Sequence, residues 1–207
     1  EAMVAAGIAS VTTGANHSCA LTTVGGVKCW GRNSTGQLGD NSTTQRPAPV
    51  DVVGLANGIA EVVAGDHHSC ARGIGGGVKC WGWNVFGQLG DGSNSDRPAP
   101  VDVSGLASGT TALGAGTFHS CAMRTNGAMS CWGRNDFGQL GDGTQSNRNE
   151  PVDVIGLGDA ATAIGGGSSH TCALVSTGVK CWGLNSSGQL GDGTLTQRST
   201  PAAPIAQ

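Results

Sequence analysis

The sequence has little charge and no long apolar run, and both shortages narrow the range of functions. Charged residues make up only 12% of the 207 residues and the formal net charge is −3, so the chain lacks the basic surface that holds nucleic acid. No apolar stretch approaches the roughly 18 residues that cross a bilayer. Residues 3–11 also lack the basic start of a signal peptide, which indicates a mature or trimmed chain. We therefore expect no nucleic-acid partner and no membrane span.

Catalytic patterns are equally scarce. The chain shows no Ser-His-Asp order, paired catalytic carboxylates, phosphate-binding loop, cofactor fingerprint or Cys-x-x-Cys pair. Asp66-His67-His68-Ser69 offers the residue types of a catalytic triad, but neighbouring positions on a strand cannot converge on one substrate atom. We therefore expect a protein that is not an enzyme and that has no cofactor.

A repeat with a period of 51 residues organises the chain. In each unit a His stands two residues before a first Cys, and a Cys-Trp-Gly triplet and a Gly-Gln-Leu-Gly-Asp segment follow. The first cysteines are Cys19, Cys70, Cys121 and Cys172. A period near this length with several short β-like segments is typical of propellers or stacked arrays, whose units bury each other's faces. We expect a single all-β domain over residues 1–207, with units at about 3–53, 54–104, 105–155 and 156–207.

Each unit has room for four short strands and none for a helix. In the second unit we expect them at 59–64, 69–72, 78–81 and 101–103. In the third unit Thr125-Asn126-Gly127 suits a tight hairpin turn, so the second and third strands should pair antiparallel. A proline precedes each expected fourth strand, which is typical of the outer edge of a sheet. These prolines are Pro49, Pro100, Pro151 and Pro201.

The hairpin register predicts that the cysteines pair within each unit. Closing the turn at Thr125-Asn126-Gly127 puts Cys121 opposite Cys131, and opposed residues have Cα atoms roughly 4.5 to 5.5 Å apart, which a disulfide spans. The shorter last hairpin, which turns at Ser176-Thr177, still opposes its two cysteines. The expected disulfides are Cys19–Cys29, Cys70–Cys80, Cys121–Cys131 and Cys172–Cys181. Four pairs with no odd thiol indicate an oxidising compartment, so a secreted or cell-surface, extracellular or periplasmic protein.

Metal binding is the alternative that these residues leave open. Each unit offers His-x-Cys followed by a second Cys, but these are three ligands at unusual spacing, where a structural zinc site takes four. The stretch from Asp91 to Asp96 has oxygen ligands at alternate positions for calcium, yet it lacks the bidentate Glu of an EF-hand loop. We therefore expect disulfides and no metal.

Four other residue types recur in every unit and are expected to hold the fold together. The Trp residues should fill the layers between sheets, the His residues should tie adjacent strands by hydrogen bonds, and the Asp residues should close turns. The Arg series, with an Asp of the expected fourth strand, indicates an ion pair or strand bracket. The series are Trp30, Trp81, Trp132 and Trp182; His17, His68, His119 and His170; Asp40, Asp91, Asp142 and Asp192; and Arg46, Arg97, Arg148 and Arg198, with Asp51, Asp102 and Asp153.

Positions that change between units are the ones that packing does not dictate. Two such sets stand out, the loop after each Trp-Gly and the residue before each repeated His. They carry aromatic residues outside the repeated set, and aromatic residues with Arg are the usual anchors of protein contacts. The candidate partner-binding residues are Trp83, Phe86, Phe118, Arg134 and Phe137. Local packing of these side chains is the alternative.

These motifs resemble the regulator of chromosome condensation (RCC1-like) repeat family. The resemblance rests on His-Ser-Cys-Ala-Leu at 17–21, Cys-Trp-Gly at 29–31 and Gly-Gln-Leu-Gly at 36–39, which recur in all four units with small changes such as Met123. It implies a β-propeller of four-stranded blades, and the Cys pair in each hairpin is similar to the variant in secreted bacterial members. The family commonly has seven blades, so four units imply a closed four-blade ring, an incomplete ring or a ring that another chain completes.

The resemblance implies binding, because members of the family act as an exchange factor for a small GTPase, as an enzyme inhibitor and as protein-binding platforms. We expect a secreted, non-enzymatic propeller scaffold whose variable loops bind a protein or a surface glycan. One alternative is a structural subunit whose terminal blades associate head to tail into a filament or a multi-chain ring. A further alternative is a regulator or inhibitor of a partner enzyme.

Overall fold

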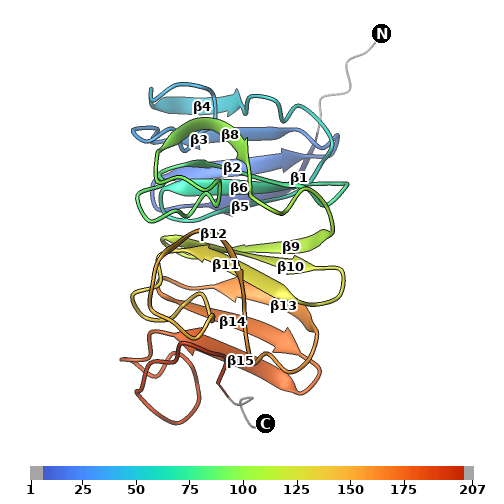
Figure 1. Cartoon of the computed structure of the whole chain (residues 1–207). Coiled ribbons are helices and arrows are strands. Elements are labelled where there is room, and N and C mark those ends of the chain that lie inside the picture. Colours follow the sequence, from blue (N-terminus) through green and yellow to red (C-terminus); the bar gives the residue numbers. More distant parts are fainter. Residues whose placement is uncertain (1–6, 203–207) are drawn as a thin grey trace.

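Four antiparallel β-sheets make up the part of the chain that the computed structural model describes, residues 7–202 (Figure 1). The first three sheets have four strands each and the last has three. Within residues 7–202 no helix is long and apolar enough to span a membrane. The strands are β1 (Ile8–Thr13), β2 (His17–Thr22), β3 (Val27–Gly31), β4 (Arg46–Asp51), β5 (Ile59–Ala64), β6 (His68–Gly73), β7 (Val78–Gly82), β8 (Arg97–Asp102), β9 (Thr110–Ala115), β10 (His119–Arg124), β11 (Met129–Gly133), β12 (Arg148–Asp153), β13 (Ala161–Gly166), β14 (His170–Val175) and β15 (Gly178–Gly183).

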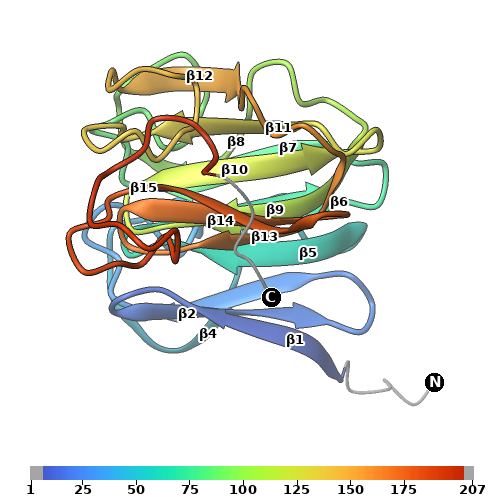
Figure 2. The same ribbon diagram turned by 90° about the horizontal axis from the view of Figure 1, so that it is seen from below.

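The sheets follow one another in chain order along a stack, with the first sheet at one end and the last at the other (Figure 1). Within each sheet the strands also follow chain order, so β1, β5, β9 and β13 form one side of the stack and lie against one another. The fourth strands form the opposite, outer edges. Figure 2 shows this order for the third sheet, from β12 at the outer side of the view to β9 in the middle.

The strand predictions for the second unit are right for the first three strands and wrong for the start of the fourth. Strand β8 begins at Arg97, so Pro100 lies inside it instead of before it, and Pro49 and Pro151 likewise lie inside β4 and β12. An edge strand tolerates internal proline because it pairs on one side only. The last sheet lacks a fourth strand within residues 7–202, and Pro201 lies outside any strand.

All four predicted disulfides are present, so the cysteines are not zinc ligands. Their Cα–Cα distances are each 4.1 Å, slightly shorter than the expected 4.5 to 5.5 Å, and the two cysteines of each pair are directly opposed. In the third hairpin the Arg124 N–H donates to the Ala128 carbonyl at 2.8 Å, which closes the predicted turn and opposes Cys121 and Cys131. The last hairpin turns between Val175 and Gly178 and keeps the same opposition of cysteines despite its shorter loop.

Adjacent sheets pack face to face through apolar residues, and within residues 7–202 the second and third sheets are covered on both faces. The face of the first sheet that carries the disulfide packs against Val62, Ala71 and Trp81 of the second sheet. The two later contacts repeat this arrangement. Trp81, Trp132 and Trp182 have 0% exposed surface, as predicted, whereas Trp30 is partly exposed because no described residue precedes its sheet in the stack. The prediction that all four Trp residues fill layers between sheets is therefore wrong for Trp30.

A chain of hydrogen bonds, the inter-sheet relay, accompanies this packing. His17 Nε2 lies 2.8 Å from Ser69 Oγ, the Ser69 hydroxyl donates to the Gln37 carbonyl at 3.2 Å, and Trp81 Nε1 donates to the same carbonyl at 2.9 Å. Because the Ser69 proton is used on Gln37, the hydroxyl accepts from a protonated Nε2 of His17. The repeated His residues thus link adjacent sheets, whereas the sequence pattern predicts links between adjacent strands. The other two relays are His68–Ser120–Gln88–Trp132 and His119–Thr171–Gln139–Trp182.

The repeated Asp closes its turn, as predicted, and is also the partner of the repeated Arg. Asp40 accepts hydrogen bonds from Asn33, Ser42 and Arg46, with Arg46 Nε at 2.8 Å. The predicted pairing of Arg46 with Asp51 is wrong, since Asp51 pairs with Lys28.

The carboxylates of the stretch from Asp91 to Asp96, considered for calcium, already accept hydrogen bonds from other residues of the chain. Arg97 Nε donates to Asp91, and the backbone N–H of Asn84 donates to Asp96. Among residues 7–202 no group of three or more His, Cys, Asp or Glu side chains is placed to hold a metal ion.

Removing one disulfide should destabilise the fold by an amount set by its short loop. Closing a loop of about ten residues lowers the entropy of the unfolded chain by an amount worth roughly 2.5 kcal/mol. The double variant Cys121→Ala/Cys131→Ala should therefore lose about 2 to 3 kcal/mol of unfolding free energy in urea titrations. Reduced and unreduced wild-type protein should differ by two hydrogens per bond in mass spectrometry. A double variant as stable as the wild type would contradict this account.

The buried histidines should make stability fall in mild acid. Burial lowers the pKa of His17 to about 4, of His68 to about 3 and of His119 to about 4, with neighbouring histidines adding to each shift. The unfolded chain, with His pKa near 6.5, therefore binds protons that the folded chain refuses. Stability should be complete above about pH 6.5 and decline as the pH falls toward about 4.

Denaturant titrations at about pH 7 and about pH 5 measure this decline. The variant His68→Gln should be less stable at neutral pH, because its relay is lost, but should show a smaller loss between the two pH values. Ile74→Ala, at a position that is 79% exposed and carries no titratable group, is the control and should keep the wild-type loss. An unchanged loss in His68→Gln would show that another group causes the acid sensitivity.

Candidate functional site

The two sets of variable positions meet in space at one end of the strands. The residue before the repeated His enters the second strand of each sheet, and the loop after Trp-Gly leaves the third. A backbone hydrogen bond joins them: the Trp83 N–H donates to the His67 carbonyl at 2.9 Å, and the Arg134 N–H donates to the Phe118 carbonyl at 2.9 Å. Equivalent bonds occur in the first and last units. Each unit therefore presents both of its variable segments side by side.

Glycine is required where the third strand passes into the variable loop. Gly133 has φ +104, and a Cβ atom at this position would lie 2.6 Å from the Phe118 carbonyl oxygen. Gly82 has the same φ and a similar close approach to the His67 carbonyl. The glycine in the repeated Trp-Gly pair thus allows the close contact between the two variable segments.

Buried amides fix the loop that follows. Asn84 and Gln88 have 0% exposed surface. Asn84 Oδ1 accepts from the Leu89 N–H at 2.9 Å, and Gln88 Oε1 accepts from the Phe86 N–H at 3.0 Å. Because these amides recur in the third unit as Asn135 and Gln139, both loops hold their outward side chains on a fixed backbone.

Four rings gather on this frame from the second and third units. The Trp83 ring meets the Phe118 ring at 5.1 Å and the Phe86 ring at 5.5 Å, both in edge-on geometry, and Phe86 and Phe118 are 5.6 Å apart. His67 joins them, 5.8 Å from Trp83. Such geometry is typical of favourable aromatic pairs.

Arg134 lies over these rings. Its guanidinium carbon is 5.1 Å from the centre of the Phe86 ring, 5.7 Å from that of Phe118 and 6.0 Å from that of Phe137. Asp136 accepts from Arg134 Nε at 2.6 Å and holds the guanidinium in place. Cation–π contacts of this kind leave the remaining guanidinium donors available for a ligand.

The structure thus brings together all five residues singled out from the sequence as partner-binding candidates. We call Trp83, Phe86, Phe118, Arg134 and Phe137, with His67, the aromatic–arginine cluster. Sequence reasoning places His67 among the variable positions but not among the binding candidates. All six side chains pack on one another and stay partly exposed, so the cluster combines local packing with an open surface.

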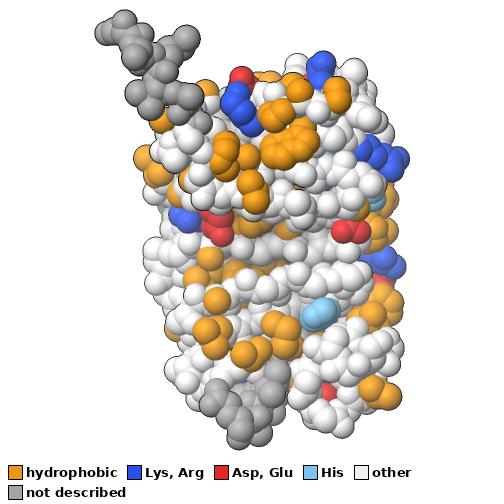
Figure 3. Space-filling view, turned by 180° about the vertical axis from the view of Figure 1, so that it is seen from behind, with side chains coloured by type: hydrophobic (Ala, Val, Ile, Leu, Met, Phe, Trp, Pro, Cys, Tyr) orange, Lys and Arg blue, Asp and Glu red, His pale blue; other side chains and the backbone are white. Residues whose placement is uncertain are grey.

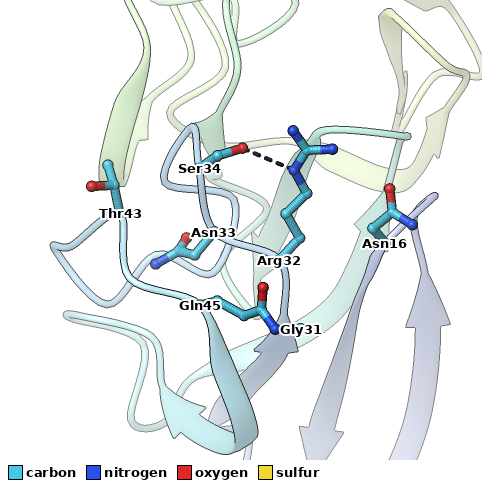
Figure 4. Close-up of a pocket in the computed structure, with 7 residues that line it drawn as sticks. All are labelled: Asn16, Gly31, Arg32, Asn33, Ser34, Thr43 and Gln45. Atoms are coloured by element: carbon cyan, nitrogen blue, oxygen red, sulfur yellow. Dashed lines mark hydrogen bonds between the residues drawn. The ribbon is translucent and has the colours of Figure 1, made fainter.

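A polar pocket adjoins the cluster. It has a volume of about 630 Å³ and is lined by residues of the first unit: Asn16, Gly31, Arg32, Asn33, Ser34, Thr43 and Gln45 (Figure 4). Arg32 Nε donates to Ser34 Oγ at 3.0 Å. A smaller hollow of about 230 Å³ shares Arg32 and Ser34 with this pocket and is bounded on its other side by His67, Trp83 and Phe118. The pocket and the cluster therefore form one continuous surface across the first three units.

Family comparisons agree with the repeat and the sheet order. The model of the Regulator of chromosome condensation (RCC1) repeat matches residues 25–72, 76–123 and 126–174, and a second model of the same repeat matches 8–37, 59–88, 111–139 and 161–189. The chain belongs to the RCC1 repeat family. Its sheets are RCC1 blades, and the Trp, His and Gly-Gln-Leu-Gly series are the repeated residues that hold one blade to the next.

Curated relatives include proteins with different functions. The Arabidopsis thaliana ultraviolet-B receptor UVR8 is 34% identical over 172 residues, which cover 81% of this chain and 39% of UVR8. The probable E3 ubiquitin-protein ligase HERC4 of Rattus norvegicus is 35% identical over 172 residues, which cover 81% of this chain and 16% of HERC4. The chain thus spans well under half of each relative.

Solved RCC1-type structures show the same fold. Human WBSCR16 superposes with a TM-score of 0.82 at 25% identity, over 94% of this chain and 51% of that one. Yeast RCC1 (Prp20), solved bound to Kap60, superposes with a TM-score of 0.83 at 21% identity, over 100% of this chain and 50% of that one. The predicted all-β propeller is confirmed, and the four blades within residues 7–202 form an open arc.

Comparing two glycine-to-alanine substitutions separates the cost of the close contact at the cluster from the general cost of a side chain at positive φ. Gly133→Ala meets the Phe118 carbonyl, whereas Gly105→Ala, at φ +71, meets no atom within 4 Å. Each change should cost about 1 to 2 kcal/mol for the left-handed backbone, and Gly133→Ala should cost more because the segments must also separate. Urea titrations of both variants check this. Equal losses would show that the cluster does not depend on the close approach.

Proposed function

We propose that the chain is a secreted, non-enzymatic propeller scaffold that binds a partner protein through the aromatic–arginine cluster. One observation carries the proposal. The chain has five Trp, three Phe and no Tyr, and four of the Trp belong to the repeated series. Every other aromatic residue lies in this one cluster, although the repeat leaves room for such residues in all four units.

The chemistry of the cluster fits a protein surface. Trp and Arg are the side chains most enriched among residues that dominate binding energy, and they act where a rigid neighbourhood holds them. Here the loop amides hold the backbone, Asp136 holds the guanidinium, and the rings support each other. Little side-chain entropy would be lost on binding, which favours affinity. Yeast RCC1 (Prp20), which has the same fold, was solved bound to the protein Kap60.

Secretion is supported by the disulfides. All eight cysteines are paired, one bond to each hairpin, and such bonds persist in oxidising compartments. Regulation or inhibition of a partner enzyme would be one consequence of binding at the cluster.

A surface glycan is the second candidate ligand, favoured by the polar pocket. Trp83 lines the hollow that leads to Arg32, and Asn16 and Gln45 supply further hydrogen-bonding groups along the pocket. Ligand sites that combine an apolar surface with a few convergent polar groups are common in proteins.

Binding measurements with three forms of the protein test the proposal. The wild type, the double variant Trp83→Ala/Phe118→Ala and the control Ile74→Ala are immobilised and exposed to extracellular proteins of the source organism. Ile74 is 79% exposed at the hairpin tip, at the far end of the same strands. We expect a protein ligand that binds the wild type and the control alike and binds the double variant at least about tenfold more weakly.

A glycan array probed with the same three proteins tests the second candidate. Loss of array binding in the double variant, without any loss of protein binding, would identify the ligand as a glycan. Thermal unfolding of all three forms confirms that the substitutions leave the fold intact. If no ligand of either kind depends on Trp83 and Phe118, the cluster is a packing feature and the proposal is wrong.

A further inference from the structure

A second pocket lies between the first and second sheets, beside the hairpin turn that joins β6 and β7. It has a volume of about 460 Å³ and is formed entirely by described residues. Leu55 of the first unit and Ile59 and Ala71 of the second give it an apolar lining, and Lys79 and Asp102 are the charged residues that line it. Pockets of roughly 300 to 1,000 Å³ with a mostly apolar lining and a few polar groups are typical of small-molecule sites.

Gly73, the last residue of β6, leaves this space open. Its equivalents in the other three units are Thr22, Arg124 and Val175, so only the second unit lacks a side chain at this position. Thr22 and Val175 are buried, and Val175 belongs to the apolar core between the third and fourth sheets. The side chain that fills this position in the other sheets is therefore missing at the pocket.

The backbone does not require a glycine at this position. The φ angle of Gly73 is not positive, and a Cβ atom there would lie 3.6 Å from the Gly58 carbonyl oxygen and 3.7 Å from that of Gly77, which are ordinary contacts. Ile59, which pairs with Gly73 in the sheet, is larger than its counterparts in the next two sheets, yet the pocket remains. A glycine in a strand weakens the strand and often marks the close approach of a ligand.

The two charged groups of the pocket neutralise each other. Lys79 Nζ donates to Asp102 Oδ1 at 2.6 Å. A ligand carboxylate would face the Asp102 carboxylate, and a ligand ammonium would compete with Lys79 for it. An uncharged hydroxyl group fits better, because the Lys79 ammonium has further donors and, among the described residues, Asp102 Oδ2 accepts no hydrogen bond.

The protein surface gives no other reason to expect a charged ligand. Charged residues make up only 12% of the chain, and on the face of the molecule seen in Figure 3 the blue and red side chains are few and lie apart. Charged ligands concentrate where many charges of the opposite sign line one site. The pocket therefore favours an uncharged, mostly apolar ligand.

We propose that this pocket binds a small, compact, uncharged molecule with an apolar body and one hydroxyl group. The apolar body lies against Leu55 and Ala71 in the space that Gly73 leaves. The hydroxyl group exchanges hydrogen bonds with the pair of Lys79 and Asp102. The pocket and the aromatic–arginine cluster lie at opposite ends of β6 and β7, so this site does not depend on protein binding at the cluster.

Nuclear magnetic resonance titrations with three probes that share one ring test the ligand class. Cyclohexanol should shift the backbone amide signals of Ala71 and Gly73 in a saturable way. Cyclohexanecarboxylate and cyclohexylammonium should each bind at least about threefold more weakly, because each brings an unpaired charge to the ion pair. The absence of saturable shifts with cyclohexanol, or a charged probe that binds as tightly, would overturn the proposal.

Filling the pocket with a side chain tests its location. Gly73→Val introduces the side chain of the equivalent Val175 and should weaken cyclohexanol binding at least about tenfold. It should also raise the unfolding temperature, because the added side chain covers apolar surface. Gly75→Ala is the matched control, because Gly75 lies in the same hairpin turn, its φ is not positive, and a Cβ atom there meets no atom within 4 Å. It should bind cyclohexanol like the wild type.

Gly73→Thr, with the side chain of the equivalent Thr22, repeats the test with a different filling group. Circular dichroism identifies the variants that are folded. If a folded Gly73→Val or Gly73→Thr variant binds cyclohexanol as tightly as the wild type, the ligand lies elsewhere and the proposal is wrong.

Discussion

The structure depends on the contact between the disulfide face of one sheet and the Trp face of the next. A single sheet of this chain is apolar on both faces and cannot bury either face by itself. Its stability therefore depends on packing against the neighbouring sheets. The inter-sheet relay makes that contact asymmetric, because the two sheets contribute different groups to it. Its His lies on the earlier sheet, its hydroxyl and its Trp on the later one, and the Gln carbonyl between them accepts two hydrogen bonds. Hydrogen bonds between specific groups of two sheets favour one register between them, which apolar packing alone would not.

The sequence is most informative where structure is local. The hairpin register and the disulfides follow from short turns, because a turn of two or three residues determines which side chains oppose each other. That reasoning holds even for the last hairpin. Its loop is shorter and its two cysteines are correspondingly closer in the sequence, so they still lie opposite each other. It fails at the fourth strand, which begins earlier than expected. A proline signals an edge, but how far an edge strand extends depends on pairing with β3, β7 or β11, which a proline alone does not reveal.

Contacts between residues far apart in the sequence are the second limit on what the sequence predicts. The repeated Arg and two repeated Asp series are evident in the sequence, but only the folded turn shows that Arg46 reaches Asp40 instead of Asp51. The repeated His is equally visible, yet its partner is the Ser or Thr one unit further along, because that residue lies across the gap between sheets. Trp30 shows the same limit. A repeat alignment makes it equivalent to three buried residues, whereas its burial depends on a neighbour that the repeat itself does not supply.

The candidate site follows from this division between repeated and variable positions. Repeated residues use their side chains for packing between sheets, so they leave the strand ends free to vary. A backbone bond and an obligatory glycine bring the two free segments of each unit together, which is why residues as far apart as His67 and Trp83 are neighbours.

Adjacent sheets then bring the variable segments of the second unit against those of the third. These two units are the ones covered on both sides, and they are also the ones that carry every additional aromatic side chain. A recognition surface built there rests on the most fully packed part of the arc that residues 7–202 form.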